Sequence, residues 1–295
     1  MSIKLPKIFL DSGDPSETKK AKSLLGTLDG QTTNPSLVAK NPEVQKYLAS
    51  GKKLSEIELL DIYKDMVAEL DKELAGPISV ETYADWNTKS ETMLAQAMEM
   101  KHWGKNIYLK FPTIPEGIKA AHEYVKLGGS VNMTLVFDQI QAAAVYSATL
   151  PTFKPAFISP FLGRWDDRGF RGLDLIKNIR KMYDSFNKIR NEKKNHVEVL
   201  AASIRNLNHF YGAIVLGADI LTVPLTIIEE WIEDERFIPD DTYRPNTPGL
   251  RSLIYQTLPY HDDFTQYEVK KEAGTLLDEG LMKFSKDWNN LLDKN

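Results

Sequence analysis

The 295-residue sequence contains no cysteine. Disulfides, cysteine-based zinc and iron–sulfur sites, and cysteine nucleophiles are therefore excluded as the basis of its fold or chemistry. Only five histidines are present, and no two have the close spacing that would place two imidazoles on one face of a helix. We therefore expect no metal site and no cofactor.

The sequence also lacks a strong excess of one charge and any long apolar run. A formal net charge of -4 gives no electrostatic footprint for a polyanion. The N-terminus has no signal-peptide core, and no apolar run approaches the length needed to span a bilayer. We expect a cytoplasmic protein whose partners include neither nucleic acid nor membrane.

What the sequence does contain is a regular alternation of short apolar runs with longer stretches of helical period. This pattern is typical of βα units around a parallel sheet, and eight such units close a barrel. The sequence therefore predicts an α/β protein with a single (β/α)8 TIM barrel. The eight predicted strands are residues 7–11, 30–33, 78–81, 107–111, 131–135, 156–159, 197–202 and 220–224.

Several loops carry residues typical of helix ends. Residues 14–17, 88–91 and 113–116 each resemble a helix start, with a capping side chain and a glutamate three positions later. The glycines at 128–129 are expected to end the helix that precedes them. Further helices are predicted as two stretches within 35–76 and over 134–149, 174–190, 206–217 and 225–234.

The pattern changes after the eighth unit. Residues 235–265 contain four prolines and no clear period, so we expect an ordered excursion or a flexible loop. A helical pattern with an apolar stripe resumes over residues 267–292. We expect residues 1–234 to form the barrel, and residues 235–295 to pack on it as a loop and C-terminal helix. Packing of that helix on a neighbouring subunit is the alternative, which leaves a homo-oligomer open.

Polar residues lie at or just after the ends of seven consecutive predicted strands. Catalytic side chains in (β/α)8 barrels come from this end of the strands and from the loops that follow. We therefore expect a polar chamber there. The candidate residues are Asp11, Asn34, Glu81, Lys110, Asn132, Thr134, Ser159, Ser203 and Arg205.

Lys110 is the candidate nucleophile. Alternation along its strand directs Ile107 and Leu109 toward the helices, and Tyr108 and Lys110 into the barrel. Burial disfavours the charged ammonium of a lysine, so a neutral amine becomes available to form an imine with a carbonyl. An imine allows the neighbouring carbon–carbon bond to break, because the electrons are stored as an enamine.

Asp11 and Glu81 are the candidate proton carriers. One carboxylate would take the proton from the hydroxyl on the carbon that is released, and the other would manage the water of imine formation. The alternative is that Lys110 forms a structural ion pair with one of them. Because buried ion pairs are weak sources of stability, we favour the catalytic interpretation.

A phosphate-binding site is predicted beyond the seventh strand. Ser203 and Arg205 open the following helix, where free backbone N–H groups and a guanidinium can meet an anion. Arg164, in the neighbouring loop, could supply a second guanidinium. The alternative for either arginine is an ion pair with a carboxylate at the rim: Asp166, Asp167 or Glu230.

Several motifs, in order along nearly the whole chain, resemble the transaldolase family. They are residues 9–12, 32–37, 108–112, 131–135, 158–164, 200–206 and 276–288. The resemblance implies that Lys110 is the Schiff-base lysine, that Asp11 is the acid/base for carbon–carbon cleavage, and that Glu81 and Thr134 position the catalytic water. It also implies that donor-sugar hydroxyls are bound by Asn34, Asn132 and Ser159. The residues that match the phosphate site are Arg164, Ser203 and Arg205.

The family also contains fructose 6-phosphate aldolases, which release dihydroxyacetone. Transaldolases typically have glutamate on strand 3 and phenylalanine two residues after the strand 6 serine, where the aldolases tend to have glutamine and tyrosine. Glu81 and Phe161 therefore favour a transaldolase that acts on sugar phosphates. The alternatives are an aldolase and a sugar-phosphate-binding protein without turnover. Residues 235–265 have no counterpart in the family that we can place.

Overall fold

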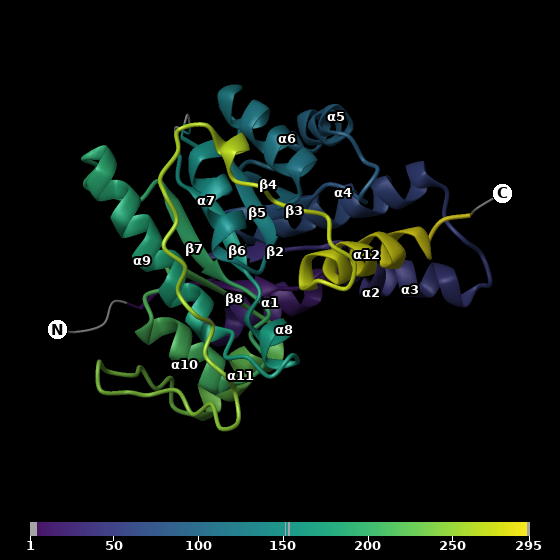
Figure 1. The fold of residues 1–295 in the computed structure, drawn as a ribbon. Coiled ribbons are helices and arrows are strands. Elements are labelled where there is room, and N and C mark those ends of the chain that lie inside the picture. Colours follow the sequence, from purple (N-terminus) through teal and green to yellow (C-terminus); the bar gives the residue numbers. More distant parts are fainter. Residues whose placement is uncertain (1–4, 151, 153, 294–295) are drawn as a thin grey trace.

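Eight parallel strands close into a barrel surrounded by helices (Figure 1). The computed structural model describes residues 5–150, 152 and 154–293. The strands are β1 (Lys7–Asp11), β2 (Gly30–Thr32), β3 (Ile78–Glu81), β4 (Ile107–Pro112), β5 (Val131–Val136), β6 (Ala156–Pro160), β7 (Val197–Ala201) and β8 (Ile220–Val223). Each pairs in parallel with the next, and β8 pairs with β1. The predicted (β/α)8 barrel is confirmed.

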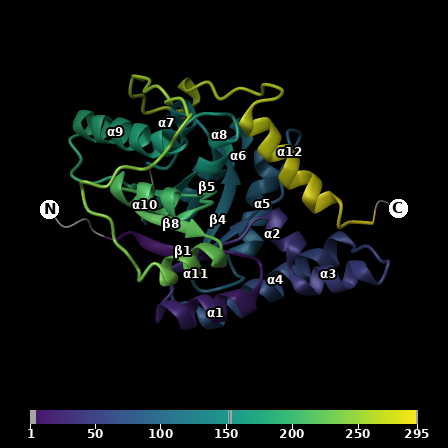
Figure 2. The same cartoon turned by 90° about the horizontal axis from the view of Figure 1, so that it is seen from below.

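The helices follow the strands around the outside of the barrel (Figure 2). They are α1 (Pro15–Leu25), α2 (Pro35–Lys40), α3 (Pro42–Ala49), α4 (Glu56–Glu73), α5 (Ser90–Met100), α6 (Pro115–Lys126), α7 (Gln139–Ala148), α8 (Leu162–Asp166), α9 (Leu173–Arg190), α10 (Leu207–Val215), α11 (Leu225–Glu233) and α12 (Leu276–Asn289). No helix within the described ranges combines the length and apolarity needed to cross a membrane.

Residues 35–76 form three helices, so the prediction of two was wrong. Asn34 and Asn41 each accept a backbone hydrogen bond at the start of a helix whose first residue is proline. Because a residue before proline is disfavoured in the α conformation, the second Asn-Pro pair separates α2 from α3. The short helix α8 was not predicted, and α7 begins at Gln139 because β5 extends to Val136.

Two of the three predicted helix starts were wrong in their capping residue. Asp14 does cap α1, since its Oδ1 accepts a 2.8 Å bond from Ser16 N. Thr88 instead bonds to Asp85 in the preceding turn, and α5 begins without a side-chain cap. Thr113 donates its hydroxyl to carbonyls of β5, which ties β4 to β5 and leaves α6 uncapped as well. Thr88 bonds within a local turn and Thr113 bonds the neighbouring strand, so neither hydroxyl takes the capping role that the local pattern suggested.

Residues 235–275, here called the strap, leave α11 and run along the outer helices to α7 before returning to α12 (Figure 1). The strap has one 3-10 turn, η1 (Phe264–Gln266), and is held by bonds such as Asn178 Nδ2 to Leu253 O at 3.0 Å. The C-terminal helix begins at Leu276 rather than at 267, because Thr275 caps it. It then lies beside α2 (Figures 1 and 2).

The part of the barrel interior that lies away from the carboxyl ends of the strands, here called the lower part, is apolar. Ile107 and Leu109 belong to the core between strands and helices, whereas Tyr108 points inward, as alternation predicts. The inward apolar cluster consists of Phe9, Tyr108, Phe157, Leu200, Ala202 and Ile220. This cluster closes the barrel below the polar residues at the carboxyl ends of the strands.

Candidate active site

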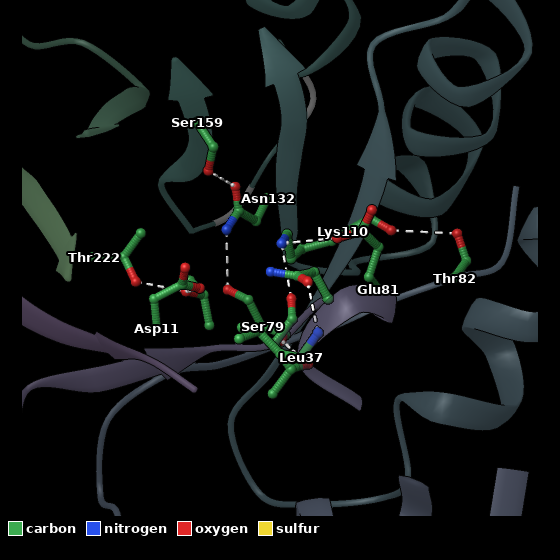
Figure 3. A network of polar contacts seen from close by, with 12 residues as sticks. Asp11, Leu37, Ser79, Glu81, Thr82, Lys110, Asn132, Ser159 and Thr222 are labelled. Carbon is green, nitrogen blue, oxygen red and sulfur yellow. Dashed lines mark hydrogen bonds and ion pairs between the residues drawn. The ribbon is translucent and has the colours of Figure 1, made fainter. Parts of the chain in front are cut away.

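Lys110 lies on β4 inside the barrel and is only 3% exposed. Its Nζ donates a 2.8 Å hydrogen bond to the backbone carbonyl of Thr33 and lies 2.8 Å from Oε2 of Glu81 (Figure 3). The Glu81 side chain is equally buried, at the end of the neighbouring strand β3. The ion pair that we considered as the alternative to catalysis is therefore present, and the surrounding groups decide what it can do.

Asp11 ends β1, and its Oδ1 accepts a 2.7 Å bond from the Thr32 hydroxyl. Burial raises the pKa of the Asp11 carboxyl, and the charge of Lys110 and the Thr32 bond only partly oppose that effect. Burial also raises the pKa of Glu81, against the lowering effect of Lys110, and the nearby charge of Asp11 adds to the increase. Two carboxyls that share one cation thus hold protons at a higher pH than free carboxyls, as proton carriers need to do.

Asn132 and Ser159 form a polar chain on the other side of Lys110 (Figure 3). The Ser159 hydroxyl donates a 2.7 Å bond to Asn132 Oδ1, and Asn132 Nδ2 donates a 3.1 Å bond to the hydroxyl of Ser79. Asn132 is the direct neighbour of Lys110 in the β4–β5 register. Its amide is therefore fixed in orientation next to the lysine.

Asn34 and Thr134 each keep hydrogen-bonding capacity to spare. Asn34 Oδ1 caps α2 by accepting a 3.0 Å bond from Leu37 N, and Asn34 also lines the cavity. The hydroxyl of Thr134 is buried and has no hydrogen-bond partner among the described residues. A buried hydroxyl without a partner is uncommon and is typical of a site that binds water or ligand.

A cavity of about 400 Å³ lies above Lys110. Nine of the predicted site residues line it: Asp11, Asn34, Lys110, Thr134, Ser159, Phe161, Arg164, Ser203 and Arg205. Glu81 and Asn132 do not line it; they contact lining residues from the buried side. A larger cavity, about 870 Å³, lies under the strap and contains none of the predicted residues. Because the chemical groups converge at the smaller cavity, we take that one as the site.

Several lining residues were not predicted. They are Thr32, Ser36, Leu37, Lys40, Ala202, Thr222, Lys283 and Phe284. Alternation could have identified Thr222, which lies two residues after the inward Ile220 on β8. No local signal could have identified Lys283 and Phe284, because they belong to α12 and reach the cavity only through its packing beside α2.

Ser203 and Arg205 line the cavity from the loop between β7 and α10. β7 ends at Ala201, and Ser203 has a left-handed φ of 56°, so the chain leaves the strand before Arg205. Arg205 forms a two-point ion pair with Asp167, with Nη2 2.7 Å from Oδ2, and this pair lowers the pKa of Asp167. The rim ion pair weighed as an alternative is thus present for Arg205. The Arg164 side chain lines the cavity and makes no hydrogen bond or close ion pair with the described residues, although its charge helps to lower the pKa of Asp167.

Gly163 is needed for this arrangement of the two loops. A side-chain carbon at Gly163 would overlap Arg205 Nε and would lie 2.7 Å from the carbonyl oxygen of Ser203. The first turn of α8 therefore contacts the loop after β7 directly.

Across residues 5–150, 152 and 154–293, no group of three or more carboxylates and histidines is arranged to hold a metal ion.

The sequence profile of the Transaldolase/Fructose-6-phosphate aldolase family matches residues 8–295. The chain belongs to this family. It is 37% identical over 224 residues to "Probable transaldolase" of Leptospira biflexa, covering 75% of this chain and 88% of that protein. It is 32% identical to a protein of the same name from Sulfurihydrogenibium sp. (strain YO3AOP1), covering 82% of this chain and 99% of that protein.

Likeness to solved structures is weaker. Phosphoenolpyruvate phosphomutase from Streptomyces platensis subsp. rosaceus superposes with a TM-score of 0.46 at 9% identity, over 79% of this chain and 81% of that one. A likeness at this level carries no argument about function. Family membership therefore comes from the sequence profile and the relatives, and it is consistent with an aldolase- or transaldolase-type enzyme.

Proposed function

We propose that this protein is a transaldolase that transfers a dihydroxyacetone unit from a ketose phosphate to an aldose phosphate through a Schiff base on Lys110. Fructose 6-phosphate and sedoheptulose 7-phosphate are the expected donors, as in the pentose phosphate pathway. The observation that carries the proposal is the Lys110 amine, buried under the cavity and 2.8 Å from Glu81. A cytoplasmic location and the sugar phosphates as partners belong to the same proposal.

In the first half-reaction, Lys110 gives the proton of its ion pair to Glu81, and the neutral Nζ attacks the ketone carbon of the donor. Water then leaves to give an imine. Glu81 supplies the proton for that water, and the unpartnered Thr134 hydroxyl holds the water in place. Asp11 then takes the proton from the C4 hydroxyl, the C3–C4 bond breaks, and an aldose phosphate departs. The electron pair of the broken bond stays on the lysine-bound three-carbon unit as an enamine.

In the second half-reaction the same steps run in reverse with an acceptor. The enamine carbon attacks the aldehyde, Asp11 returns its proton to the new hydroxyl, and water releases the ketose from Lys110. The raised pKa values of Asp11 and Glu81 support these roles, because each carboxyl must hold a proton in one step and release it in another.

The phosphate of donor and acceptor is assigned to the side of the cavity that carries Arg164, Ser203 and Arg205. Two guanidiniums match the charge of a phosphate dianion and can bond to it in a two-point geometry. Asn34 and Ser159 line the same cavity and would bind the hydroxyls of the three-carbon unit, with Asn132 orienting the Ser159 hydroxyl from the buried side. Phosphate binding requires that Arg205 give up or share its contact with Asp167.

An aldolase that releases dihydroxyacetone is the second candidate. The same lysine and carboxyls would support it, because the two reactions differ only in the fate of the enamine carbon. It takes up a proton in the aldolase, after which water releases dihydroxyacetone, and it attacks an aldehyde in the transaldolase. Glu81 and Phe161 favour transfer, since these are the residue types that transaldolases typically have. A sugar-phosphate-binding protein without turnover is the third candidate, which a buried amine with two proton carriers makes the weakest.

Borohydride reduction in the presence of fructose 6-phosphate tests the proposal. We expect a donor-derived adduct on Lys110, located by peptide mass mapping, and none in a sample treated without sugar. An unmodified Lys110 at saturating donor would contradict both enzyme functions. Turnover is then measured with and without erythrose 4-phosphate. Efficient release of free dihydroxyacetone without acceptor would identify an aldolase instead.

A further inference from the structure

The hydrogen-bond ladder between β2 and β3 ends one bond early at the carboxyl end of the two strands, beside the amine of Lys110. Gln31 N donates to Pro77 O at 3.0 Å, and Thr33 N donates to Ser79 O at 3.0 Å. In a parallel ladder the next bond would run from Glu81 N to the carbonyl of Thr33. Glu81 N does not make this bond, so two backbone groups at the edge of the site need other partners.

Two side chains supply those partners from opposite faces of the sheet. The hydroxyl of Tyr63 accepts the Glu81 N–H at 2.9 Å from the helix side. The amine of Lys110 donates to the Thr33 carbonyl at 2.8 Å from inside the barrel. One ladder bond has thus been replaced by two, and one of the two holds the proposed nucleophile.

Tyr63 meets the requirements of this position because its phenol can donate and accept at once. The Thr33 hydroxyl donates to Ser79 O at 2.8 Å, so in the 2.6 Å contact between Thr33 and Tyr63 the phenol is the donor. Burial raises the pKa of Tyr63 well above its ordinary value, so the phenol keeps its proton. A phenylalanine could make neither bond.

The ring of Tyr63 is fixed by two tryptophans. Tyr63 lies on α4, is 1% exposed, and packs edge-on against Trp103 with ring centroids 5.4 Å apart. Its other neighbour is Trp288, at 6.1 Å, which belongs to α12. The C-terminal helix that contributes Phe284 to the cavity therefore also holds Tyr63 in place.

We propose that Tyr63 is a positioning residue for the reaction: it holds Glu81 N and so keeps the Thr33 carbonyl available to Lys110. This inference rests on the proposed Schiff-base role of Lys110. Without the phenol, the Glu81 N–H has the Thr33 carbonyl as its natural ladder partner. Closing the ladder would take an acceptor away from the lysine and would move the Glu81 backbone.

The test is Tyr63→Phe, with Tyr183→Phe as the matched control. Tyr183 is also fully buried and also bonds a backbone group, donating to Ala142 O at 2.9 Å, but it lies away from the site. For Tyr63→Phe we expect kcat to fall about ten- to a hundredfold, because misplaced catalytic groups cost that much. KM for fructose 6-phosphate should stay within about twofold, since the phosphate and hydroxyl contacts remain. Tyr183→Phe should lose stability only.

Adduct formation on Lys110 separates the possible failures. If wild-type protein forms no borohydride adduct, the proposed function fails and the role of Tyr63 fails with it. If wild type is trapped, and Tyr63→Phe is trapped at the same rate with unchanged kcat, then only the role of Tyr63 is contradicted.

A second pair of variants covers the case in which Tyr63→Phe does not fold. Thr33→Ser keeps the hydroxyl that Tyr63 and Ser79 O contact, whereas Thr33→Val removes it. We expect Thr33→Val to lower kcat and Thr33→Ser to restore it. Equal kcat in the two Thr33 variants would overturn the proposal.

Discussion

The lower and upper parts of the barrel interior are built from the same strands with opposite chemistry. On four strands, an apolar inward residue is followed two positions later by a polar one: Phe9 and Asp11, Tyr108 and Lys110, Phe157 and Ser159, Ile220 and Thr222. Successive inward residues on one strand are only about 7 Å apart. The boundary between a packed core and a reactive chamber is therefore a single step along each strand.

The lower part is closed by aromatic packing. The rings of Tyr108 and Phe157 stack with centroids 4.1 Å apart, and Phe9 packs edge-on against Phe157 at 6.1 Å. Gly30 is required on the neighbouring strand, because a side-chain carbon there would lie 2.6 Å from the Phe9 ring. Lys110 is only 3% exposed beside this packing, and such burial strengthens the electrostatic interactions of its amine.

Lys110→Met gives the largest expected effect and tests the upper part. Loss of the nucleophile should lower kcat for transfer by at least about 10⁴-fold. The protein should still fold, because Glu81 and Asp11, whose pKa values burial already raises, can take up a proton when the cation is removed. Transfer assays and thermal unfolding near pH 6 measure the two quantities. A variant that is unfolded rather than inactive would contradict this division of roles.

Phe157→Ala tests the lower part. We expect it to lose stability while its active site keeps its substrate contacts. Removing a fully buried aromatic side chain costs about 3–5 kcal/mol of unfolding free energy, because the cavity it leaves is only partly filled. The remaining folded protein should keep KM near the wild-type value, since Phe157 does not line the active-site cavity. Denaturant unfolding and steady-state kinetics at low temperature make the comparison. Phe157→Leu, which fills most of the space, is the matched control.

Asp11→Asn should change the free energy of unfolding by a smaller amount, and the change should depend on pH. The folded-state pKa of Asp11 is raised, so its stabilising contribution is fully present below about pH 4, the unfolded pKa, and is lost as pH rises through the folded value. Asparagine does not ionise. The variant should therefore gain stability relative to wild type as pH rises, which urea unfolding from pH 4 to pH 8 would detect.

Asp167→Asn at the rim supplies the contrast for that experiment. Its pKa is lowered, mainly by Arg205, so its contribution is present above the unfolded pKa and is lost as pH falls. Relative to wild type, Asp167→Asn should therefore lose stability as pH rises, which is the opposite trend. The loss should be small because the Asp167 side chain is 49% exposed and screened by solvent. If the stability of both variants, relative to wild type, changed in the same direction with pH, the carboxyl in the cavity and the carboxyl at the rim would not differ in the direction of their pKa shifts.

The sequence predicted all eight strands and nine of the residues that line the cavity, yet it did not predict how those residues are held. Alternation placed Tyr108 and Lys110 inside, because side chains of a strand point to opposite faces. It could not predict that Thr88 and Thr113 would bond away from their helices, or that Ser203 would turn the chain out of β7. The Thr113 bonds depend on β5, a strand that comes later in the chain. The Thr88 bond is local and shows that a short turn can compete with a helix cap for the same hydroxyl.

Local sequence by itself predicted the eight βα units, the inward face of β4 and the polar residues at seven strand ends, since these follow from hydrophobic period and residue type. Tertiary structure decided which groups became partners. The pairing of Arg205 with Asp167, the placement of α12 over the cavity, and the exchange of a ladder bond between Tyr63 and Lys110 all join segments far apart in sequence. Such contacts are set by the packing of whole elements, which no local pattern encodes.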